Sequence, residues 1–333
     1  MKKMPYILIL AFITFALVFG ACAGSDSDDD DDNNDTEIDY RQEMRNFVQA
    51  ISQYAKGINP NFNVITQNGQ ELLTRDGEEN GSPDTTYIKA LDGVGQEDLF
   101  YGYTDDNEAT PANEKNYLIA FLDVAKNNGL KVLVTDYCWT RSYMEDSYFQ
   151  NEKRGYISFA ADHRELDNIP AYPTEPYNVS SQNIMSLSDA RNFLYLINPS
   201  SFPNKGSFLE ALRETDYDVF IIDLFYDEAA LTAQELASLK IKANGGTRKV
   251  IAYMSIGEAE SYRFYWQDEW NSNPPSWLAE ENPDWPGNFK VRYWDPAWQS
   301  IIYGNDGSYV KKILDAGFDG TYLDIIDAFE YFE

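Results

Sequence analysis

The sequence has little histidine, little cysteine and few basic residues. Its 333 residues include one histidine, His163, and two cysteines, Cys22 and Cys138. A single imidazole excludes metal sites built from several histidines. Lys and Arg number 26 against 55 Asp and Glu, which gives a formal net charge of −29. Because phosphate binding needs clusters of Lys and Arg, we expect no nucleic-acid partner and an attraction for cationic ligands instead.

The first residues resemble a targeting segment. Two lysines precede a nearly unbroken apolar run from Ile7 to Phe19, which is typical of an export signal. The next residues, Phe19-Gly20-Ala21-Cys22, resemble a bacterial lipoprotein signal, which implies a lipid on the Cys22 thiol. The alternative is an ordinary signal peptide in which this cysteine is incidental. We therefore expect residues 1–21 to be a lipoprotein signal and the protein to be exported, as an outer-membrane or cell-surface lipoprotein that contacts the membrane only through its lipid.

A change of composition divides the rest of the chain. Residues 22–39 are dominated by Asp, Asn and Ser, so they cannot bury a core and are expected to form a disordered acidic tether. From Tyr40 the composition is that of a globular protein, and residues 40–333 are enough for one large domain with a full core.

Short apolar segments alternate with helical patterns along this domain. The predicted strands are residues 62–66, 96–101, 131–138, 155–160, 193–198, 217–223, 249–258 and 318–324. Helices are expected near residues 42–56, 114–127 and 233–243. Eight strands that are mostly separated by helices predict a closed (β/α)8 barrel of the TIM type.

Acidic side chains lie at the ends of several of these strands. They are Glu97, Asp136, Asp223, Glu258 and Asp324. In a parallel barrel these ends converge on one face, where active sites lie. A ring of acids with almost no histidine suggests either glycoside hydrolysis by two carboxyl groups or a divalent metal held by oxygen ligands. For Asp324 and the nearby Asp327, the simpler alternative is a helix N-cap and a solvated acid.

A long insertion follows the seventh predicted strand, over residues 259–295. It holds five tryptophans, at positions 266, 270, 277, 285 and 294. Taken singly, each tryptophan is expected to pack in the core or the loop. Aromatic faces also suit sugar rings and attract cations, so five in one insertion predict at least one that faces a ligand.

Several motifs carry a resemblance to a known family. They are Val250 to Arg263 (VIAYMSIGEAESYR), Trp294-Asp295-Pro296-Ala297-Trp298, Gly317 to Gly320, Leu323 to Asp327, Gln67 to Leu73 and Gly93 to Phe100. Together they resemble the bacterial branch of the endo-alpha-1,4-polygalactosaminidase-related family, glycoside hydrolase family 114. The resemblance covers nearly all of residues 41–333. It implies a TIM-type barrel that cleaves galactosamine-containing polysaccharide. We expect no cofactor, no metal and no protein partner.

The resemblance also assigns roles to residues. Asp324 would be the nucleophile or the carboxylate that stabilises the developing cation, and Glu97 the general acid/base. The polysaccharide, a cationic or N-acetylated amino-sugar polymer cut within its chain, would be bound in a pocket lined by Asp327, Asp223, Glu258, Tyr253, Asn68, Asp136, Tyr137, Tyr195 and Trp294. The alternative is a non-catalytic glycan-binding surface lipoprotein, in which the acids only hold sugar hydroxyls.

The order of the two halves departs from the family. In relatives the segment that resembles residues 190–333 comes first, and the segment that resembles residues 41–165 comes second. The chain therefore resembles a circular permutant; the rival explanation is a truncated or mis-assembled gene. Eight strands must close into a barrel, and the only open seam lies between the first and the last of them. Permutation therefore predicts that the strands at 62–66 and 318–324 lie side by side in parallel. It also predicts that the helix at 42–56 packs beside the latter strand and that the domain ends are neighbours.

Overall fold

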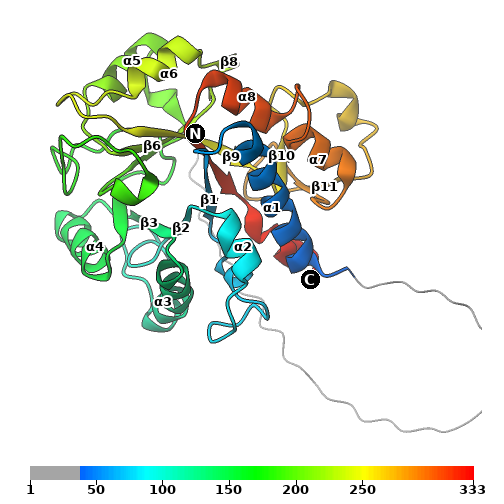
Figure 1. The fold of residues 1–333 in the computed structure, drawn as a ribbon, viewed down its shortest axis with the longest axis horizontal. Helices are drawn as coiled ribbons and strands as arrows, with labels where there is room; N and C mark the ends of the chain where they lie inside the picture. Colours follow the sequence, from blue (N-terminus) through cyan, green and yellow to red (C-terminus); the bar gives the residue numbers. More distant parts are fainter. Residues whose placement is uncertain (1–37) are drawn as a thin grey trace, which may run out of the picture. The chain divides into compact units, whose positions relative to one another are not determined.

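A sheet of eight parallel strands forms the centre of the protein (Figure 1), in the spatial order β4-β3-β2-β1-β13-β9-β6-β5. The computed structural model describes residues 38–333, and Tyr40–Glu333 form one compact unit. The strands are β1 (Asn63–Gln67), β2 (Gly93–Glu97), β3 (Lys131–Tyr137), β4 (Ile157–Ala161), β5 (Leu194–Leu196), β6 (Val219–Asp223), β9 (Lys249–Ser255) and β13 (Gly320–Asp324). The predicted signal segment, Cys22 and nearly all of the tether lie outside the described residues.

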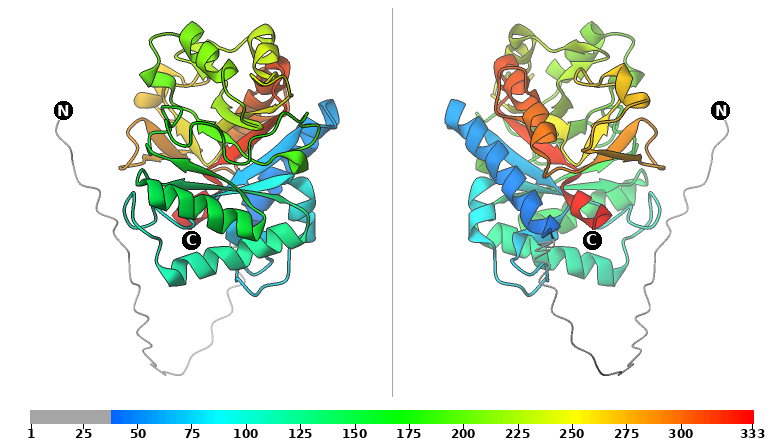
Figure 2. Two further views of the ribbon diagram at one scale, coloured as in Figure 1. Left: turned by 90° about the vertical axis from the view of Figure 1, so that its left-hand side faces the viewer. Right: turned by 90° about the vertical axis from the view of Figure 1, so that its right-hand side faces the viewer.

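Helices surround this sheet (Figures 1 and 2) and connect most of its neighbouring strands. The α-helices are α1 (Tyr40–Ile58), α2 (Thr85–Ala90), α3 (Ala112–Asn127), α4 (Arg141–Arg154), α5 (Lys205–Arg213), α6 (Ala233–Leu239), α7 (Pro296–Ile302) and α8 (Tyr309–Ala316). In α1 the buried side chains Phe47, Val48, Ile51 and Ala55 recur at helical spacing, so one stripe faces the core. The predicted (β/α)8 barrel of the TIM type is confirmed.

Shorter elements complete the fold. The 3-10 helices are η1 (Gln70–Leu73), η2 (Leu187–Asp189), η3 (Pro199–Ser201), η4 (Asp268–Asn271) and η5 (Ile326–Tyr331). A hairpin of β7 (Phe225–Tyr226) and β8 (Ala229–Ala230) follows β6. The tryptophan-rich insertion forms a three-stranded antiparallel sheet of β10 (Glu258–Glu260), β12 (Asn288–Val291) and β11 (Leu278–Glu281). Glu258 therefore begins this insertion sheet, whereas the sequence analysis placed it at the end of a barrel strand.

The two ends of the described unit meet, as predicted. β1 and β13 pair in parallel from Asn63 opposite Gly320 to Thr66 opposite Leu323. Arg41 Nη2 and Glu333 Oε2 are 3.0 Å apart, and Figure 2 shows α1 (blue) alongside η5 (red). Residues from both halves of the chain therefore build one barrel. The evolutionary permutation itself stays a prediction.

The second barrel strand begins and ends earlier than predicted. It spans Gly93–Glu97, whereas the sequence analysis placed it at residues 96–101. Two glycines made this segment a poor strand candidate. A Cβ atom at Gly95 would lie 1.8 Å from the Tyr322 hydroxyl oxygen, so only glycine fits where this strand passes the tyrosine inside the barrel.

The sheet is open where the chain lacks a helix. No hydrogen-bonded ladder joins β4 to β5 in the described unit. The connection between them, residues 162–193, contains only the short η2, and β5 has three residues. The rings of Phe159 and Phe193 lie 5.9 Å apart across this gap. The barrel is therefore nearly closed, with side chains rather than a backbone ladder at this seam.

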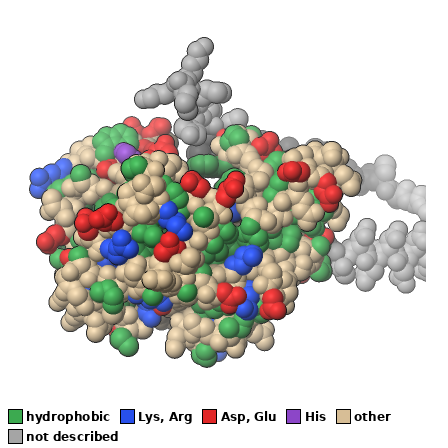
Figure 3. All heavy atoms as spheres, turned by 90° about the horizontal axis from the view of Figure 1, so that it is seen from above, with side chains coloured by type: hydrophobic (Ala, Val, Ile, Leu, Met, Phe, Trp, Pro, Cys, Tyr) green, Lys and Arg blue, Asp and Glu red, His purple; other side chains and the backbone are tan. Residues whose placement is uncertain are grey.

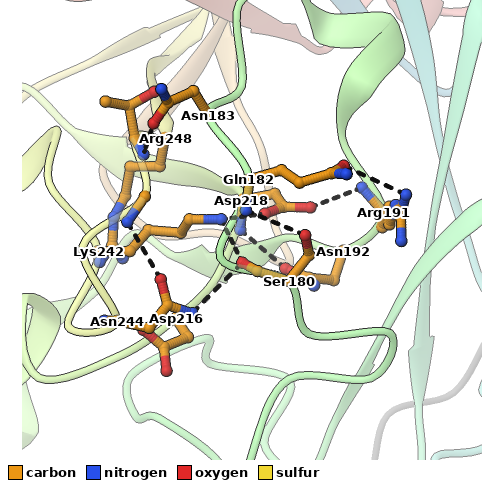
Figure 4. A network of polar contacts seen from close by, with 12 residues as sticks. Ser180, Gln182, Asn183, Arg191, Asn192, Asp216, Asp218, Lys242, Asn244 and Arg248 are labelled. Carbon is orange, nitrogen blue, oxygen red and sulfur yellow. Dashed lines mark hydrogen bonds and ion pairs between the residues drawn. The ribbon is translucent and has the colours of Figure 1, made fainter.

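A buried ion pair holds this helix-free connection to the floor of the barrel, where the strands begin (Figure 4). Lys242 Nζ lies 2.9 Å from Asp218 Oδ1, and both side chains are fully buried. The ammonium also donates to the Ser180 carbonyl oxygen at 2.5 Å. Asp218 Oδ2 accepts a bond from the Arg191 backbone N–H at 2.8 Å. The connection is thus bound to one buried charge pair at two points, Ser180 and Arg191.

The outer surface gives limited information about the expected membrane and nucleic-acid partners. Within residues 38–333 no helix is both long and apolar enough to cross a membrane. On the face drawn in Figure 3, Lys and Arg side chains lie among acidic and hydrophobic ones. The lipid anchor and the absence of a nucleic-acid partner remain predictions.

Candidate active site

A cavity of about 620 Å³ opens at the carboxyl ends of the barrel strands. The predicted site residues that line it are Asn68, Glu97, Tyr137, Tyr195, Asp223, Tyr253, Glu258, Asp324 and Asp327. Most of them end a barrel strand or follow one closely, which is why they converge although they come from distant parts of the chain.

Glu97, the last residue of β2, is held by its two neighbours in the barrel. Its Oε2 accepts a hydrogen bond from Asn68 Nδ2 at 3.1 Å, and its Oε1 accepts one from the Tyr137 hydroxyl. Asn68 also accepts from the Glu97 backbone N–H, at 3.1 Å. Asn68 has a φ of 55°, a left-handed conformation that asparagine tolerates better than most residues. The carboxyl group is therefore fixed in orientation.

Asp324, the last residue of β13, lies above a layer of tyrosines. Tyr253 donates its hydroxyl hydrogen to Asp324 Oδ2 at 2.6 Å. The ring of Tyr195 lies 6.4 Å from that of Tyr253 and 5.3 Å from that of Tyr322. This aromatic layer packs beside the carboxyl group, which remains partly exposed toward the cavity. Ile325, the next residue, has a φ of 57°, a strained conformation for a β-branched residue that turns the chain away at this point.

Burial, followed by the negative charge of Glu97, raises the pKa of Asp324 to about 7. The hydrogen bond from Tyr253 has the opposite effect, because it stabilises the carboxylate. The two carboxyl groups are thus electrostatically coupled, and Asp324 changes its charge near neutral pH.

Two more acids complete this side of the cavity. Asp327 lies on η5, and burial together with the Asp324 charge raises its pKa well above the usual range. Glu258 is fully buried; its Oε1 accepts from Asn282 Nδ2 at 2.7 Å and from the Tyr331 hydroxyl at 3.1 Å. Its Oε2 has no hydrogen-bond partner among the described residues. A buried acceptor without a partner is rare, so Glu258 is available to a ligand group.

The basic residues of the cavity are already neutralised. Arg263 lies 2.7 Å from Asp223 and 2.6 Å from Glu260. Arg164 lies 2.8 Å from Asp98 and 2.6 Å from Asp106. By contrast, Glu97, Glu258, Asp324 and Asp327 have no ion-pair partner within residues 38–333. The field inside the cavity therefore favours a cation.

Two predicted residues lie outside the cavity. Asp136 is fully buried, where its carboxyl group accepts from the Phe100 backbone N–H at 2.7 Å and from Ser147 Oγ of α4 at 2.6 Å. Successive side chains of a strand point to opposite faces, so Tyr137 points into the barrel and Asp136 points out toward α4. Trp294 packs against Tyr40 and Phe332, with ring centroids 5.0 and 4.8 Å away, where the two ends of the described unit meet.

The insertion places one tryptophan at the cavity. Trp285 lines it and is 57% exposed. Trp270 packs at 5.0 Å from Trp277 and 5.2 Å from Trp266, so these three build the insertion's own core. Trp285 thus lies where the expected ligand-facing tryptophan would be, and the expectation itself stays a prediction.

The sequence analysis missed several further lining residues, among them Arg164, Glu260, Tyr262 and Arg263. Glu260, Tyr262 and Arg263 lie within the VIAYMSIGEAESYR motif, where an Arg that closely follows two acids was a usable signal. Arg164 also lines the cavity, with its guanidinium carbon 3.9 Å from the centre of the Tyr137 ring. It comes from the helix-free connection, where no periodic pattern marks its position.

The fold and the site define a TIM-barrel protein with coupled carboxyl groups at the carboxyl ends of its strands. Residues 191–332 match the model of the glycoside-hydrolase family GH114. This match covers less than half of the chain and supports membership of glycoside hydrolase family 114 (endo-alpha-1,4-polygalactosaminidase-related).

Curated relatives extend the comparison without naming an activity. An uncharacterized protein of Methanocaldococcus jannaschii, MJ1477, is 38% identical over 180 residues, 53% of this chain and 49% of the relative. Uncharacterized proteins of Deinococcus radiodurans and Thermotoga maritima are 43% and 41% identical over 122 and 120 residues, 37% and 36% of each chain. The chain spans half or less of the length of these relatives.

Proposed function

We propose that the protein is a glycoside hydrolase that cleaves galactosamine-containing polysaccharide within its chain, with Asp324 and Glu97 as the two catalytic carboxyl groups. The observation that carries this proposal is that both groups line one cavity and are electrostatically coupled. Hydrolysis of a glycosidic bond needs two carboxyl groups whose surroundings give them different protonation. The family match supports the same reaction class.

In this mechanism Asp324 is the nucleophile or the carboxylate that stabilises the cationic transition state, and Glu97 protonates the leaving oxygen and later activates water. Tyr253 stabilises the ionised form of Asp324, while Tyr137 and Asn68 orient Glu97. An ammonium group on the bound sugar would favour ionisation of Asp324 as well. A cationic substrate therefore suits both the charge of the cavity and the state that Asp324 must reach.

The test is a polysaccharide panel. Reducing ends should be released from partially deacetylated polygalactosamine by the wild-type protein. No release from any amino-sugar polymer would contradict the proposal. Binding of such a polymer without hydrolysis would instead favour a glycan-binding surface protein, and loss of activity with a chelator would indicate a divalent-metal hydrolase.

The pH profile should reveal the role of Asp324. A nucleophile must be ionised, and its pKa of about 7 predicts that kcat/KM rises as pH increases through about 7, because the protonated form is inactive. Tyr253→Phe removes the bond that favours the carboxylate, so this limb should move to higher pH. If kcat/KM instead falls above pH 7, Asp324 is the general acid and the two roles are exchanged.

Glu258→Gln should weaken binding of a cationic polymer. The unpartnered Oε2 would become an NH2 group, which cannot accept a bond from an ammonium, so KM should rise roughly 10- to 100-fold with kcat little changed. The fully N-acetylated polymer has no ammonium and serves as the matched control. An equal rise in KM for both polymers would show that Glu258 does not distinguish them.

The proposed location is the cell surface, with attachment through a lipid on Cys22. This proposal rests on residues 1–22 alone, which lie outside the described residues.

A further inference from the structure

A second cavity, of about 260 Å³, opens beside the candidate active site. Its lining residues are Phe225, Asp227, Glu228, Tyr262, Arg263 and Phe264. Tyr262 and Arg263 line both cavities, so the two share a wall. Neither the β7–β8 hairpin nor Phe264 has a part in the mechanism proposed above.

The shared wall presents a rigid, exposed aromatic ring. Tyr262 is 62% exposed, and its hydroxyl donates to Glu260 Oε1 at 2.6 Å. The Arg263 guanidinium lies 5.2 Å from the ring centre and is itself fixed by Asp223 and Glu260. A ring that is held in place on one side and open on the other can stack against a sugar at little entropic cost.

The opposite wall of the smaller cavity is acidic. Asp227 and Glu228 form the tip of the β7–β8 hairpin, and neither side chain has a hydrogen bond or ion pair with another described residue. The Phe225 and Phe264 rings stack nearby, with centroids 5.8 Å apart. The only basic residue of the lining, Arg263, is paired twice. This cavity thus combines apolar faces with two unpaired carboxylates at its rim.

We propose that the smaller cavity is a second sugar subsite, which binds a further amino-sugar unit of the same polysaccharide. The ring of that unit would stack on Tyr262, and its ammonium group would face Asp227 and Glu228. This inference rests on the proposed function, because one substrate fills both cavities only if it is a chain. It explains why the acidic hairpin lies beside the catalytic cavity.

The experiment compares the wild-type protein with Asp227→Asn/Glu228→Gln on galactosamine oligomers of increasing length. Wild-type kcat/KM should rise with length until both cavities are filled. The variant should lose about 5- to 10-fold on long oligomers and be unchanged on the shortest oligomer that is cleaved. Fully N-acetylated oligomers should be insensitive to the change. Glu78→Gln/Glu79→Gln, which removes the same charge outside both cavities, is the matched control.

Each outcome decides the inference separately from the proposed function. If the wild type cleaves the oligomers and the hairpin variant loses no activity, the subsite alone is overturned. The same holds if the variant loses activity by an equal factor at every oligomer length. If the wild type cleaves no oligomer, the proposed function fails. Calorimetric affinities for the same oligomers then decide: a loss of affinity that grows with length supports the subsite, and equal affinity of wild type and variant overturns it.

Discussion

Asp324→Asn is expected to reduce turnover of a galactosamine polymer by several orders of magnitude and to leave the fold intact. The amide has the size of the carboxyl group but cannot become the anion that the transition state requires. Burial raises the pKa of Asp324 to about 7, so folding disfavours its ionised form, and this group contributes less stability as pH rises from about 4 toward 7. The variant has no carboxyl group to ionise at this buried position, so it avoids this loss of stability. At pH 8 it should unfold at the same temperature as wild type or at a higher one.

Glu97→Gln should also lower turnover, by about 10²- to 10⁴-fold for a general acid/base. Its signature differs from that of Asp324→Asn. Because the Glu97 charge raises the pKa of Asp324, removal of this charge should move the residual pH profile to lower pH. A substrate whose leaving group needs no protonation should recover part of the lost rate in this variant only.

Exposed Asp306 offers a control for both variants, since Asp306→Asn removes a charge outside the lining of the cavity. Near-normal turnover in Asp324→Asn or in Glu97→Gln would reject the role assigned to that residue. Loss of the thermal transition would attribute the loss of activity to misfolding instead.

Position along a strand made much of the site predictable. Asp324, Glu97 and Asp223 each end a barrel strand, and the parallel arrangement alone brings such residues together. The same rule failed for Asp136, the last residue but one of β3, because a place near the end of a strand does not say which face a side chain takes. Its neighbour Tyr137 points to the cavity, and alternation along the strand leaves Asp136 on the other face.

Other features depend on tertiary contacts that no local pattern records. The glycines of β2 obscured a strand whose glycine content follows from the close approach of Tyr322. Trp294 shares its insertion with Trp285, yet it packs where the two ends of the described unit meet, while Trp285 lines the cavity. Only the folded arrangement distinguishes these two tryptophans.

Circular permutation remains a proposal with support from two sides. β1 and β13 pair in parallel although they lie near opposite ends of the described unit. The family model matches residues 191–332, and residues 41–165 lie before that match. An exchange of halves would produce this result, since a linear match can follow only one of two exchanged segments. A truncated gene would not explain eight barrel strands in sequential order around the sheet.

Asp218→Ala should lower the free energy of unfolding by about 3–5 kcal/mol, because it leaves the Lys242 ammonium buried without its counterion. The pair is fully buried at 2.9 Å, and Asp218 also binds the backbone of Arg191. The substitution should therefore loosen the connection between β4 and β5, where the sheet has no ladder. Denaturant unfolding measures the change.

The Lys311–Asp315 pair on the surface of α8 is the matched control, with Asp315 62% exposed. Asp315→Ala should change stability far less than Asp218→Ala, since solvent screens an exposed pair. In a double-mutant cycle, Asp218→Ala with Lys242→Ala should cost less than the sum of the single changes, because the second substitution removes the stranded charge. Equal effects of Asp218→Ala and Asp315→Ala would show that the floor pair does not hold the connection, and the nearly closed barrel would then depend on apolar contacts such as that of Phe159 with Phe193.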